Sequence, residues 1–272
     1  MKINEQIYVN SIVIALRDYF NSNNKKKLVI GVSGGLDSAL AAKFSCLAVG
    51  ADNVIGVIMP TDISNKETME RARRLVKFLG INSLEVNIDE FVSPLFDRLN
   101  SELFDEKTSN DEFYNKIRFG NLAARTRMLI LYHVAHLKQG LVVGTGNKSE
   151  TLLGYTTLWG DMCCDINPLS HLYKTQVREI ARYLNLPQEI LEAAPSADLF
   201  AGQTDEGEMG ITYKDADVVM ELIFDQKIDL SVIKEIIDTP EVVDQVLYLN
   251  INSKHKRRAD KGVFSFPQSE TS

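Results

Sequence analysis

The sequence predicts an α/β fold in which a doubly wound parallel sheet is flanked by helices and followed by a helical C-terminal part. Short apolar runs alternate with helical patterns in the first half of the chain, and the pattern beyond Gly144 is mostly helical. A chain of 272 residues, of which 44% are hydrophobic, can bury a full core. We therefore expect a single domain with an α/β core at about 27–193, a helical part at about 194–260 and a frayed tail at 261–272.

Short apolar runs predict the strands, and helical periodicity predicts the helices. The expected strands are Leu28–Val32, Val54–Met59, Ser83–Ile88 and Leu141–Val143. The expected helices are Glu5–Phe20, Ser38–Val49, Lys66–Leu79, Asn115–Lys138, Lys174–Leu184, Gln188–Ala193, Thr212–Phe224 and Pro240–Ser253. Polar stretches at 94–114 and 196–210 are expected to be loops, and long loops in compact domains often act as lids.

Composition and charge exclude several classes of protein. A net charge of −7 argues against a general nucleic-acid-binding or membrane-binding surface. The sequence contains no apolar run of the roughly 18 residues that a membrane span needs, and the N-terminus lacks the pattern of a signal peptide. Three cysteines without metal-site spacing are expected to be unpaired thiols. We therefore expect a cytoplasmic protein with no nucleic-acid partner and no membrane anchor.

A glycine-rich loop, Ser-Gly-Gly-Leu-Asp-Ser at 33–38, interrupts the transition from the first strand to its helix. Loops at the carboxyl ends of parallel strands, where a helix begins, commonly bind phosphate. Gly34 and Gly35 are expected to adopt positive φ angles and to expose N–H groups, while Asp37 offers a hard oxygen for Mg²⁺. The loop matches neither the Walker A pattern, which needs a lysine, nor the Rossmann pattern. It therefore suits pyrophosphate held by backbone amides and a cation.

Ser-Gly-Gly-x-Asp-Ser after a first strand resembles the loop of the PP-loop ATP pyrophosphatases, which have an adenine nucleotide alpha hydrolase-like fold. Three further motifs narrow the resemblance: "GTGNKSETLLGY" from Gly144, "PSADLFAGQTDEGEMGITY" from Pro195, and "HKRR" from His255. Together they resemble the ammonia-dependent form of NAD synthetase over about Val29 to Arg258. Glutamine-dependent members carry an additional N-terminal amidohydrolase domain, whereas only about 27 residues precede the first strand here. The resemblance therefore implies free ammonia as the nitrogen source, with a separate glutaminase as a candidate partner that delivers it.

The resemblance implies a carbon–nitrogen ligase that converts deamido-NAD to NAD. A carboxylate is a poor electrophile, so the implied mechanism first joins it to AMP from ATP. Pyrophosphate leaves, and ammonia then displaces AMP. The resemblance also implies a Mg²⁺ cofactor, ATP as co-substrate and a homodimer.

The resemblance assigns roles to individual residues. The implied ATP contacts are Gly31, Val32, Ser33, Gly34, Gly35, Leu36, Asp37, Ser38, Thr145, Lys174 and Ser196. The implied deamido-NAD contacts are Arg125, Asp165, His255 and Lys256. Asp37 and Glu150 would hold the metal, and the implied catalytic residues are Asp37, Glu150, Asp161 and Lys174.

One segment departs from the common family pattern. Many members read Lys-Tyr-Gly-Asp-Gly-Gly just before the aspartate equivalent to Asp165, whereas this chain has Leu-Trp-Gly-Asp-Met-Cys at 158–163. The lysine expected to meet the acidic dinucleotide is therefore absent. We hypothesise that Arg127, Lys148 or a basic residue of a partner subunit replaces its charge.

Two alternative functions are another PP-loop enzyme and a nucleotide sensor. Another PP-loop enzyme could adenylate a tRNA base or a purine carbonyl, although the acidic balance disfavours a tRNA enzyme. A non-enzymatic nucleotide sensor would have no need of two carboxylates for a metal. In the helix at 115–138, the apolar residues Leu122, Leu129 and Val134 fit either a core or a dimer interface.

Overall fold

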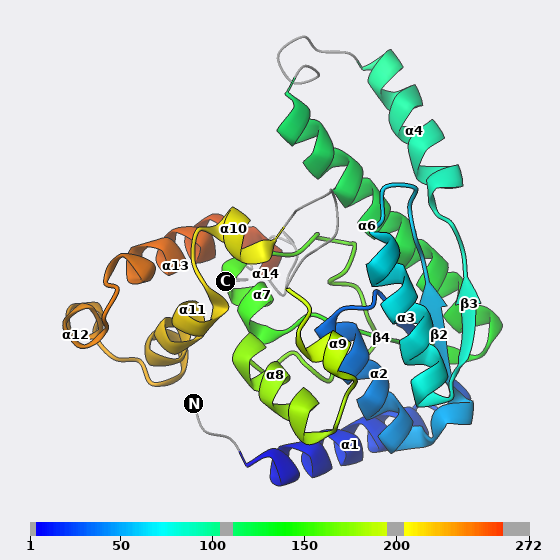
Figure 1. Ribbon diagram of the computed structural model, residues 1–272, viewed down its shortest axis with the longest axis horizontal. Helices are drawn as coiled ribbons and strands as arrows, with labels where there is room; N and C mark the ends of the chain where they lie inside the picture. The colour runs from blue at the N-terminus through cyan, green and yellow to red at the C-terminus, as the bar shows by residue number, and fades with distance from the viewer. Residues whose placement is uncertain (1–3, 104–110, 195–203, 258–272) are drawn as a thin grey trace, which may run out of the picture.

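The computed structural model describes residues 4–103, 111–194 and 204–257 (Figure 1). Its centre is a four-stranded parallel sheet with the order β3-β2-β1-β4. The strands are β1 (Lys27–Gly31), β2 (Val54–Ile58), β3 (Asn82–Glu85) and β4 (Gly140–Val143). The predicted parallel sheet is confirmed, and each strand lies within about three residues of its predicted bounds.

Alternate residues of the strands face two hydrophobic layers. Leu28 and Ile30 of β1 belong to one buried cluster, to which five α-helices contribute. These helices are α1 (Glu5–Ser22), α2 (Leu36–Val49), α3 (Lys66–Leu79), α8 (Lys174–Tyr183) and α9 (Gln188–Leu191). Val29 of β1 belongs to a second cluster with α4 (Asp89–Glu102) and α6 (Glu112–Leu137). The sheet is therefore covered by helices on both faces, as in doubly wound folds.

Beyond β4 the described chain is mostly helical, and part of it forms a third buried cluster. The helices that contribute to this cluster are α7 (Lys148–Leu153), α10 (Asp205–Met209), α11 (Tyr213–Met220), α12 (Leu230–Ile236) and α13 (Glu241–Asn252). A π-helical turn (Glu221–Asp225) follows α11, and α14 (Lys254–Arg257) follows α13. Figure 1 shows α11, α12 and α13 on the opposite side of the molecule from α3, and α11 and α13 contact α7. The division into an α/β core and a helical part, with a tail outside the described residues, stays a prediction.

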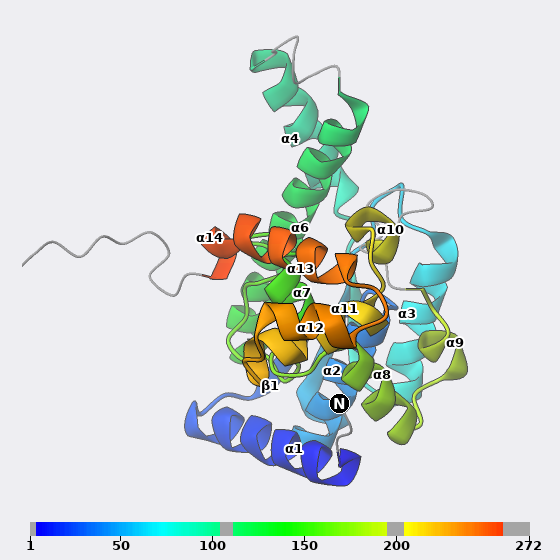
Figure 2. The same ribbon diagram turned by 90° about the vertical axis from the view of Figure 1, so that its left-hand side faces the viewer.

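Two segments expected to be loops contain helices. Part of the stretch at 94–114 belongs to α4, which continues through Pro94 and projects beside α6 (Figures 1 and 2). Pro94 lies in the second turn, where the loss of one amide donor is tolerated more easily than in the middle of a long helix. In the stretch at 196–210, residues 205–209 form α10, and residues 196–203 lie outside the described part. The expected loop structure was therefore wrong for these helical residues.

The apolar residues of α6 divide between the core and the surface. Val134 is buried in the cluster beneath the sheet, and Leu122 packs against that cluster. Leu129 is 63% exposed. Among the described helices, none is both long and apolar enough to cross a membrane.

Candidate active site

The site lies where the strand order reverses. The chain passes from β1 to β2 and β3 on one side, then returns to pair β4 with the other side of β1. The loops after β1 and β4 therefore diverge from neighbouring strand ends and leave a crevice between them. A pocket of about 580 Å³ occupies this position, and residues of both loops line it. It is therefore the natural place for a ligand in this fold.

The loop after β1 is held by its own serines. The Ser33 and Ser38 hydroxyls lie 3.0 Å apart, the Gly35 N–H donates to Ser33 Oγ at 3.2 Å, and the Ser33 N–H donates to Ser38 Oγ at 3.3 Å. The second interaction uses an amide at the start of α2, next to the positive end of that helix. The bonds among these residues therefore fix the loop in a tight turn at the N-terminus of α2, a position that favours anions.

Gly34 is required for this shape. Its φ is +83°, and a Cβ at this position would lie 2.2 Å from the Thr68 carbonyl oxygen of α3. Any side chain would therefore collide with the backbone of the neighbouring helix. The expectation of a positive φ is confirmed for Gly34 and wrong for Gly35, whose φ is −89° as the N-cap of α2.

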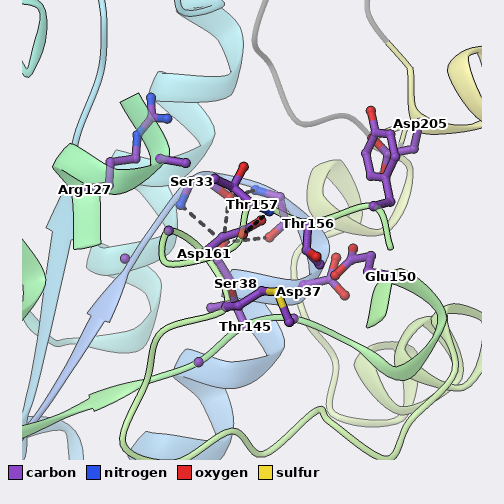
Figure 3. A pocket seen from close by; sticks show the side chains of 18 of the residues that line it. Ser33, Asp37, Ser38, Arg127, Thr145, Glu150, Thr156, Thr157, Asp161 and Asp205 are labelled. Atoms are coloured by element: carbon purple, nitrogen blue, oxygen red, sulfur yellow. Dashed lines mark hydrogen bonds between the residues drawn. The ribbon is translucent and has the colours of Figure 1, made fainter. Parts of the chain in front are cut away.

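Asp37 and Glu150 lie close together at the end of this loop (Figure 3), and Lys174 contacts both of them. Lys174 Nζ pairs with Asp37 Oδ2 and lies 3.2 Å from Glu150 Oε1. Asn147 connects the two acids, because its Nδ2 donates to Asp37 Oδ1 at 2.9 Å and its Oδ1 accepts from the Glu150 N–H at 2.9 Å. The three predicted residues, brought from α2, α7 and α8, are thus assembled into one charged centre.

Burial and shared charge govern protonation in this centre. Burial, reinforced by the neighbouring Asp37, raises the pKa of Glu150 above the ordinary carboxyl range. Burial alone would lower the pKa of Lys174, but the charges of Asp37 and Glu150 outweigh it and raise that pKa. Lys174 is therefore a permanent cation shared between two carboxylates, and it lies in position to meet a phosphate.

Asp217 of α11 supports this centre from behind. Its carboxylate accepts from Ser149 Oγ at 2.5 Å and from the Thr175 N–H at 2.8 Å. Ser149 Oγ in turn accepts from the Lys174 N–H at 2.9 Å. Asp217 is fully buried. It therefore ties the first turn of α7, which carries Glu150, to the first turn of α8, which carries Lys174.

Asp205 of α10 also lines the pocket and is 4% exposed. Its Oδ2 accepts from the Tyr213 hydroxyl at 3.1 Å, and Lys174 Nζ lies 5.2 Å from the centre of the Tyr213 ring. Burial raises the pKa of Asp205, and the charge of Lys174 opposes that effect. Asp205 was not predicted as a site residue.

Some of the other residues predicted to contact ATP line this pocket. Gly31, Val32, Leu36 and Thr145 line it. Ser196 lies outside the described residues.

Asp161 also lines the pocket (Figure 3). Its Oδ1 accepts from the Thr157 N–H at 2.6 Å. The protein atoms packed around the pocket raise the pKa of Asp161 to about 6, although its side chain remains exposed at the pocket surface.

The four residues expected to contact the dinucleotide lie in different places. Lys256 lines the pocket and donates to the Gly154 and Thr156 carbonyl oxygens at 2.7 and 2.6 Å. Arg125 donates to the Leu158 carbonyl oxygen, and Asp165 accepts from the Val142 N–H at 2.7 Å. His255 is exposed. The last three do not belong to the pocket lining, so their roles stay predictions.

The two basic residues considered as replacements for the absent lysine also differ. Arg127 lines the pocket, and its Nε donates to the Met59 carbonyl oxygen at 3.1 Å. Lys148 pairs with Asp225 at 2.5 Å, lies over the Tyr173 ring and does not line the pocket. The structure therefore favours Arg127.

Asn147, Asp205 and Asp217 were missed by sequence reasoning. A signal existed for Asn147, because Asn followed three residues later by Glu is the pattern of a capping box, which the structure contains. For Asp217 a weaker signal existed in a lone carboxylate within the apolar face of a helix. Asp205 gave no signal beyond its position in a polar loop.

Comparison with known proteins gives a consistent family. The chain matches the NAD synthase family over residues 8–260. It is 38% identical to an NH(3)-dependent NAD(+) synthetase from Fusobacterium nucleatum, with 92% of each chain covered, and 40% identical to one from Pyrococcus furiosus, with 92% and 93% covered.

Solved structures agree with these relatives. An NMN synthetase from Francisella tularensis superposes with a TM-score of 0.81 at 30% identity, with 98% and 99% of the two chains covered. An NH3-dependent NAD synthetase from Campylobacter jejuni superposes with a TM-score of 0.76 at 28% identity, with 94% and 97% covered. With its PP-loop, its parallel sheet and its match along nearly the whole sequence, this chain belongs to the NAD synthase family.

Proposed function

We propose that the protein amidates deamido-NAD with ammonia, converting ATP to AMP and pyrophosphate through an adenylated carboxylate. The observation that carries this proposal is the position of Lys174 between Asp37 and Glu150 at the end of the PP-loop, in a member of the NAD synthase family. Family membership favours this activity over adenylation of a tRNA base. The two carboxylates at the phosphate loop favour an enzyme over a nucleotide sensor.

The chain's own residues can perform the positioning that this reaction needs. The amides and hydroxyls at 33–38 would hold the β- and γ-phosphates, and Lys174 would hold a phosphate oxygen. The nicotinate carboxylate then attacks the α-phosphorus and expels pyrophosphate onto this loop. Ammonia attacks the activated carbonyl, AMP leaves, and the nitrogen loses a proton. Catalysis would rest on orientation and charge stabilisation, for which a preformed loop is suited.

The residues present fit a Mg²⁺ ion. Asp37 and Glu150 supply hard carboxylate oxygens beside the phosphate loop, and Mg²⁺ commonly combines one or two carboxylates with phosphates and water. Burial raises the pKa of Glu150, and the positive charge of Lys174 opposes this effect. The added positive charge of Mg²⁺ would oppose it further and favour the ionised carboxylate. Bound there, Mg²⁺ would neutralise charge on the leaving pyrophosphate. We propose Asp37 and Glu150 as its holders.

Product analysis tests the proposed function. The protein would be incubated with ATP, Mg²⁺, deamido-NAD and ammonium, and a parallel arm would contain glutamine in place of ammonium. We expect NAD and AMP in equal amounts with ammonium, and no NAD with glutamine. Formation of AMP without NAD would support cleavage of ATP at the PP-loop and would exclude deamido-NAD as the substrate that is amidated.

A second candidate acceptor is the mononucleotide, nicotinate mononucleotide. The Francisella tularensis protein that superposes on 98% of this chain is an NMN synthetase. Three of the four implied dinucleotide contacts, Arg125, Asp165 and His255, lie outside the pocket lining, whereas the implied ATP contacts Asp37, Thr145 and Lys174 belong to it. A third arm with the mononucleotide therefore belongs in the same experiment. A higher kcat/KM for the mononucleotide would assign that substrate.

The oligomeric state and the cellular location are also proposals. We propose a homodimer formed through the exposed side of α6, where Leu129 and Leu137 are 63% and 67% exposed. Leu129→Glu is expected to shift the mass measured by light scattering from dimer to monomer, and an unchanged mass would reject this surface. We also propose a cytoplasmic location, where a separate glutaminase could supply ammonia.

A further inference from the structure

Arg71 of α3 lies beside the PP-loop, and the mechanism proposed above does not use it. Its Nε lies 3.5 Å from the Gly34 carbonyl oxygen. Arg71 lines the active-site pocket, and so do Ser33 and Gly35 on either side of Gly34. Because Gly34 packs against the backbone of α3, the loop and this side chain stay close together. A guanidinium group therefore lies next to the loop that would meet phosphate.

The guanidinium group of Arg71 is held in place and keeps donors for a ligand. Nη1 donates to Glu67 Oε1 at 3.2 Å, and Nη2 donates to Thr68 Oγ1 at 3.0 Å. Since each terminal nitrogen carries two N–H groups, one on each remains beyond these bonds to described residues. The Arg71 side chain is 15% exposed, whereas that of Glu67 is 76% exposed. A salt bridge to so exposed a partner contributes little, so an anion in the pocket can compete with Glu67.

The other basic residues in the described part of the pocket lining are engaged elsewhere. Lys174 is shared by two carboxylates, and three others donate to main-chain carbonyl oxygens outside the PP-loop. These three are Arg127, Arg178 and Lys256. The triphosphate of ATP carries several negative charges, and arginine binds phosphate through strong paired hydrogen bonds. Arg71 is therefore a cation that touches the loop and whose carboxylate partner lies in solvent.

Arg71 and Lys174 reach the loop from different helices. Lys174 of α8 contacts Asp37, whereas Arg71 of α3 lies against Gly34. α2, which follows the loop, contacts both helices and lies between them in Figure 1. The acceptor is expected near Lys256, which contacts the turn after α7, next to the acids paired with Lys174. The α-phosphorus would face that side, so Arg71 would meet the other end of the triphosphate.

We propose that Arg71 binds the γ-phosphate of ATP and so makes the site selective for a triphosphate. This inference rests on the proposed function, which uses ATP and releases its β- and γ-phosphates together. As the carboxylate oxygen bonds to the α-phosphorus, the bond from that phosphorus to the bridging oxygen breaks, and pyrophosphate leaves with the electron pair. Arg71 holds the terminal phosphate throughout this step and stabilises the negative charge of the leaving group.

Binding of ATP, ADP and AMP to Arg71→Met tests the proposal in the absence of any acceptor. Methionine keeps much of the apolar stem of the side chain and removes its charge. With Mg²⁺ present, isothermal titration calorimetry should show a Kd for ATP raised about tenfold or more, because charge-assisted bonds to phosphate are strong. The Kd values for ADP and AMP, which lack the γ-phosphate, should stay close to those of the wild type.

Arg74→Met is the matched control on the same helix. Arg74 is 50% exposed, pairs with Glu189 and does not line the pocket, so its replacement should leave all three Kd values unchanged. A purely structural role of Arg71 in shaping the loop would weaken ADP as much as ATP, because the loop amides would meet both nucleotides. Equal loss of ATP and ADP binding in Arg71→Met, or an unchanged Kd for ATP, would overturn the proposal.

Glu67→Gln provides a second test in case Arg71→Met does not fold. It removes the exposed carboxylate that competes with phosphate for Arg71. The Kd for ATP should therefore fall about twofold or more, with no comparable change for ADP. A Kd for ATP that does not fall would count against the γ-phosphate contact and overturn the proposal.

Pyrophosphate binding, measured in the same way, separates the inference from the proposed function. Arg71→Met should raise the Kd for pyrophosphate about tenfold, as for ATP. If the wild type formed no NAD but Arg71→Met weakened both ligands, the proposed function would fail and the Arg71 site would stand. If the wild type formed NAD and Arg71→Met bound both ligands normally, the Arg71 site would fail and the proposed function would stand.

Discussion

Lys174 Nζ lies 3.2 Å from Glu150 Oε1 and is also paired with Asp37, so a single buried ammonium group serves two carboxylates. Because burial raises the pKa of Glu150, the native state retains a proton that the unfolded state releases above the ordinary carboxyl pKa of about 4.3. The stability contributed by that proton is complete below this pH and is lost as pH rises through the native pKa.

From this relationship we expect Glu150→Gln to flatten the pH dependence of stability. Without ATP or Mg²⁺, the wild type should lose about 1 kcal/mol or more of unfolding free energy between about pH 5 and pH 8 that the variant keeps. Urea unfolding at both pH values measures the difference. Glu235→Gln, at an exposed position of α12, is the control. Parallel pH curves for wild type and Glu150→Gln would refute the expectation.

Gly34 and Gly50 provide a matched pair for the PP-loop. Both have a φ of +83°, but a Cβ at Gly50 would meet no atom within 4 Å, whereas one at Gly34 would lie 2.2 Å from a backbone oxygen. Gly50→Ala should cost about 1 kcal/mol and leave the KM for ATP unchanged. Gly34→Ala should cost more and raise that KM about tenfold or more, because the loop must move away from α3. Equal effects in urea unfolding and ATP kinetics would show that the contact with α3 is unimportant.

Asp217→Asn should separate activity from stability. The amide cannot accept from both Ser149 Oγ and the Thr175 N–H, so one buried donor loses its partner, at a cost of about 1–3 kcal/mol. Since those donors position Glu150 and Lys174, kcat should fall about tenfold or more even at a temperature where the variant is fully folded. Asp229→Asn, which makes the same change at an exposed helix N-cap where the amide oxygen can still accept the capping bond, should change stability by about 0.5 kcal/mol or less with no change in kcat. A normal kcat for Asp217→Asn would limit Asp217 to a packing role.

Arg127 and Lys148 can be compared directly as replacements for the lysine absent from the segment at 158–163. Arg127 lines the pocket, whereas Lys148 is engaged by Asp225 and Tyr173. Arg127→Ala should therefore raise the KM for the dinucleotide about tenfold, and Lys148→Ala should leave it within about twofold. If neither substitution changes that KM, the charge comes from elsewhere, such as a partner subunit.

Lys256 and Lys254 form a second matched pair in α14. Lys256 holds the carbonyl oxygens of Gly154 and Thr156, and burial lowers its pKa, whereas Lys254 is exposed. Lys256→Met should release the turn at 154–156 and raise the KM for the dinucleotide several-fold, with a smaller change for ATP. Lys254→Met should change neither constant. Steady-state kinetics with each substrate varied in turn would decide, and equal effects of both substitutions would indicate only a general charge effect.

The sequence predicted the strands and the site residues well where a short local motif contains the residues concerned. The apolar run at 28–32 is suited to a buried strand, which the structure contains, and the Ser-Gly-Gly loop behind it pointed to one end of the pocket. Asp37 was predicted from that loop, and the family resemblance implied Glu150 and Lys174; the three residues meet in the structure. The α4 helix was missed because Pro94 and the acidic stretch that follows have poor helix propensity, which packing against α6 overrides.

Residues that act through a distant partner were harder to predict. Asp217 is one carboxylate in a short helix, and its importance depends on Ser149 and Thr175, which no local pattern connects to it. The position of Asp205 in the pocket depends on its contact with Tyr213, which comes from the next helix. Such properties belong to the packed chain, because they depend on which side chains meet after folding.

The bond network of Asp217 also has a consequence for synthesis of the protein. A ribosome would release the four strands and the PP-loop long before α11, so the sheet can form while the Ser149 hydroxyl and the Thr175 amide still lack their acceptor. The ATP-binding end would then mature last, when α11 docks. A nascent chain shorter than about 217 residues should therefore hold a folded sheet and remain without nucleotide affinity.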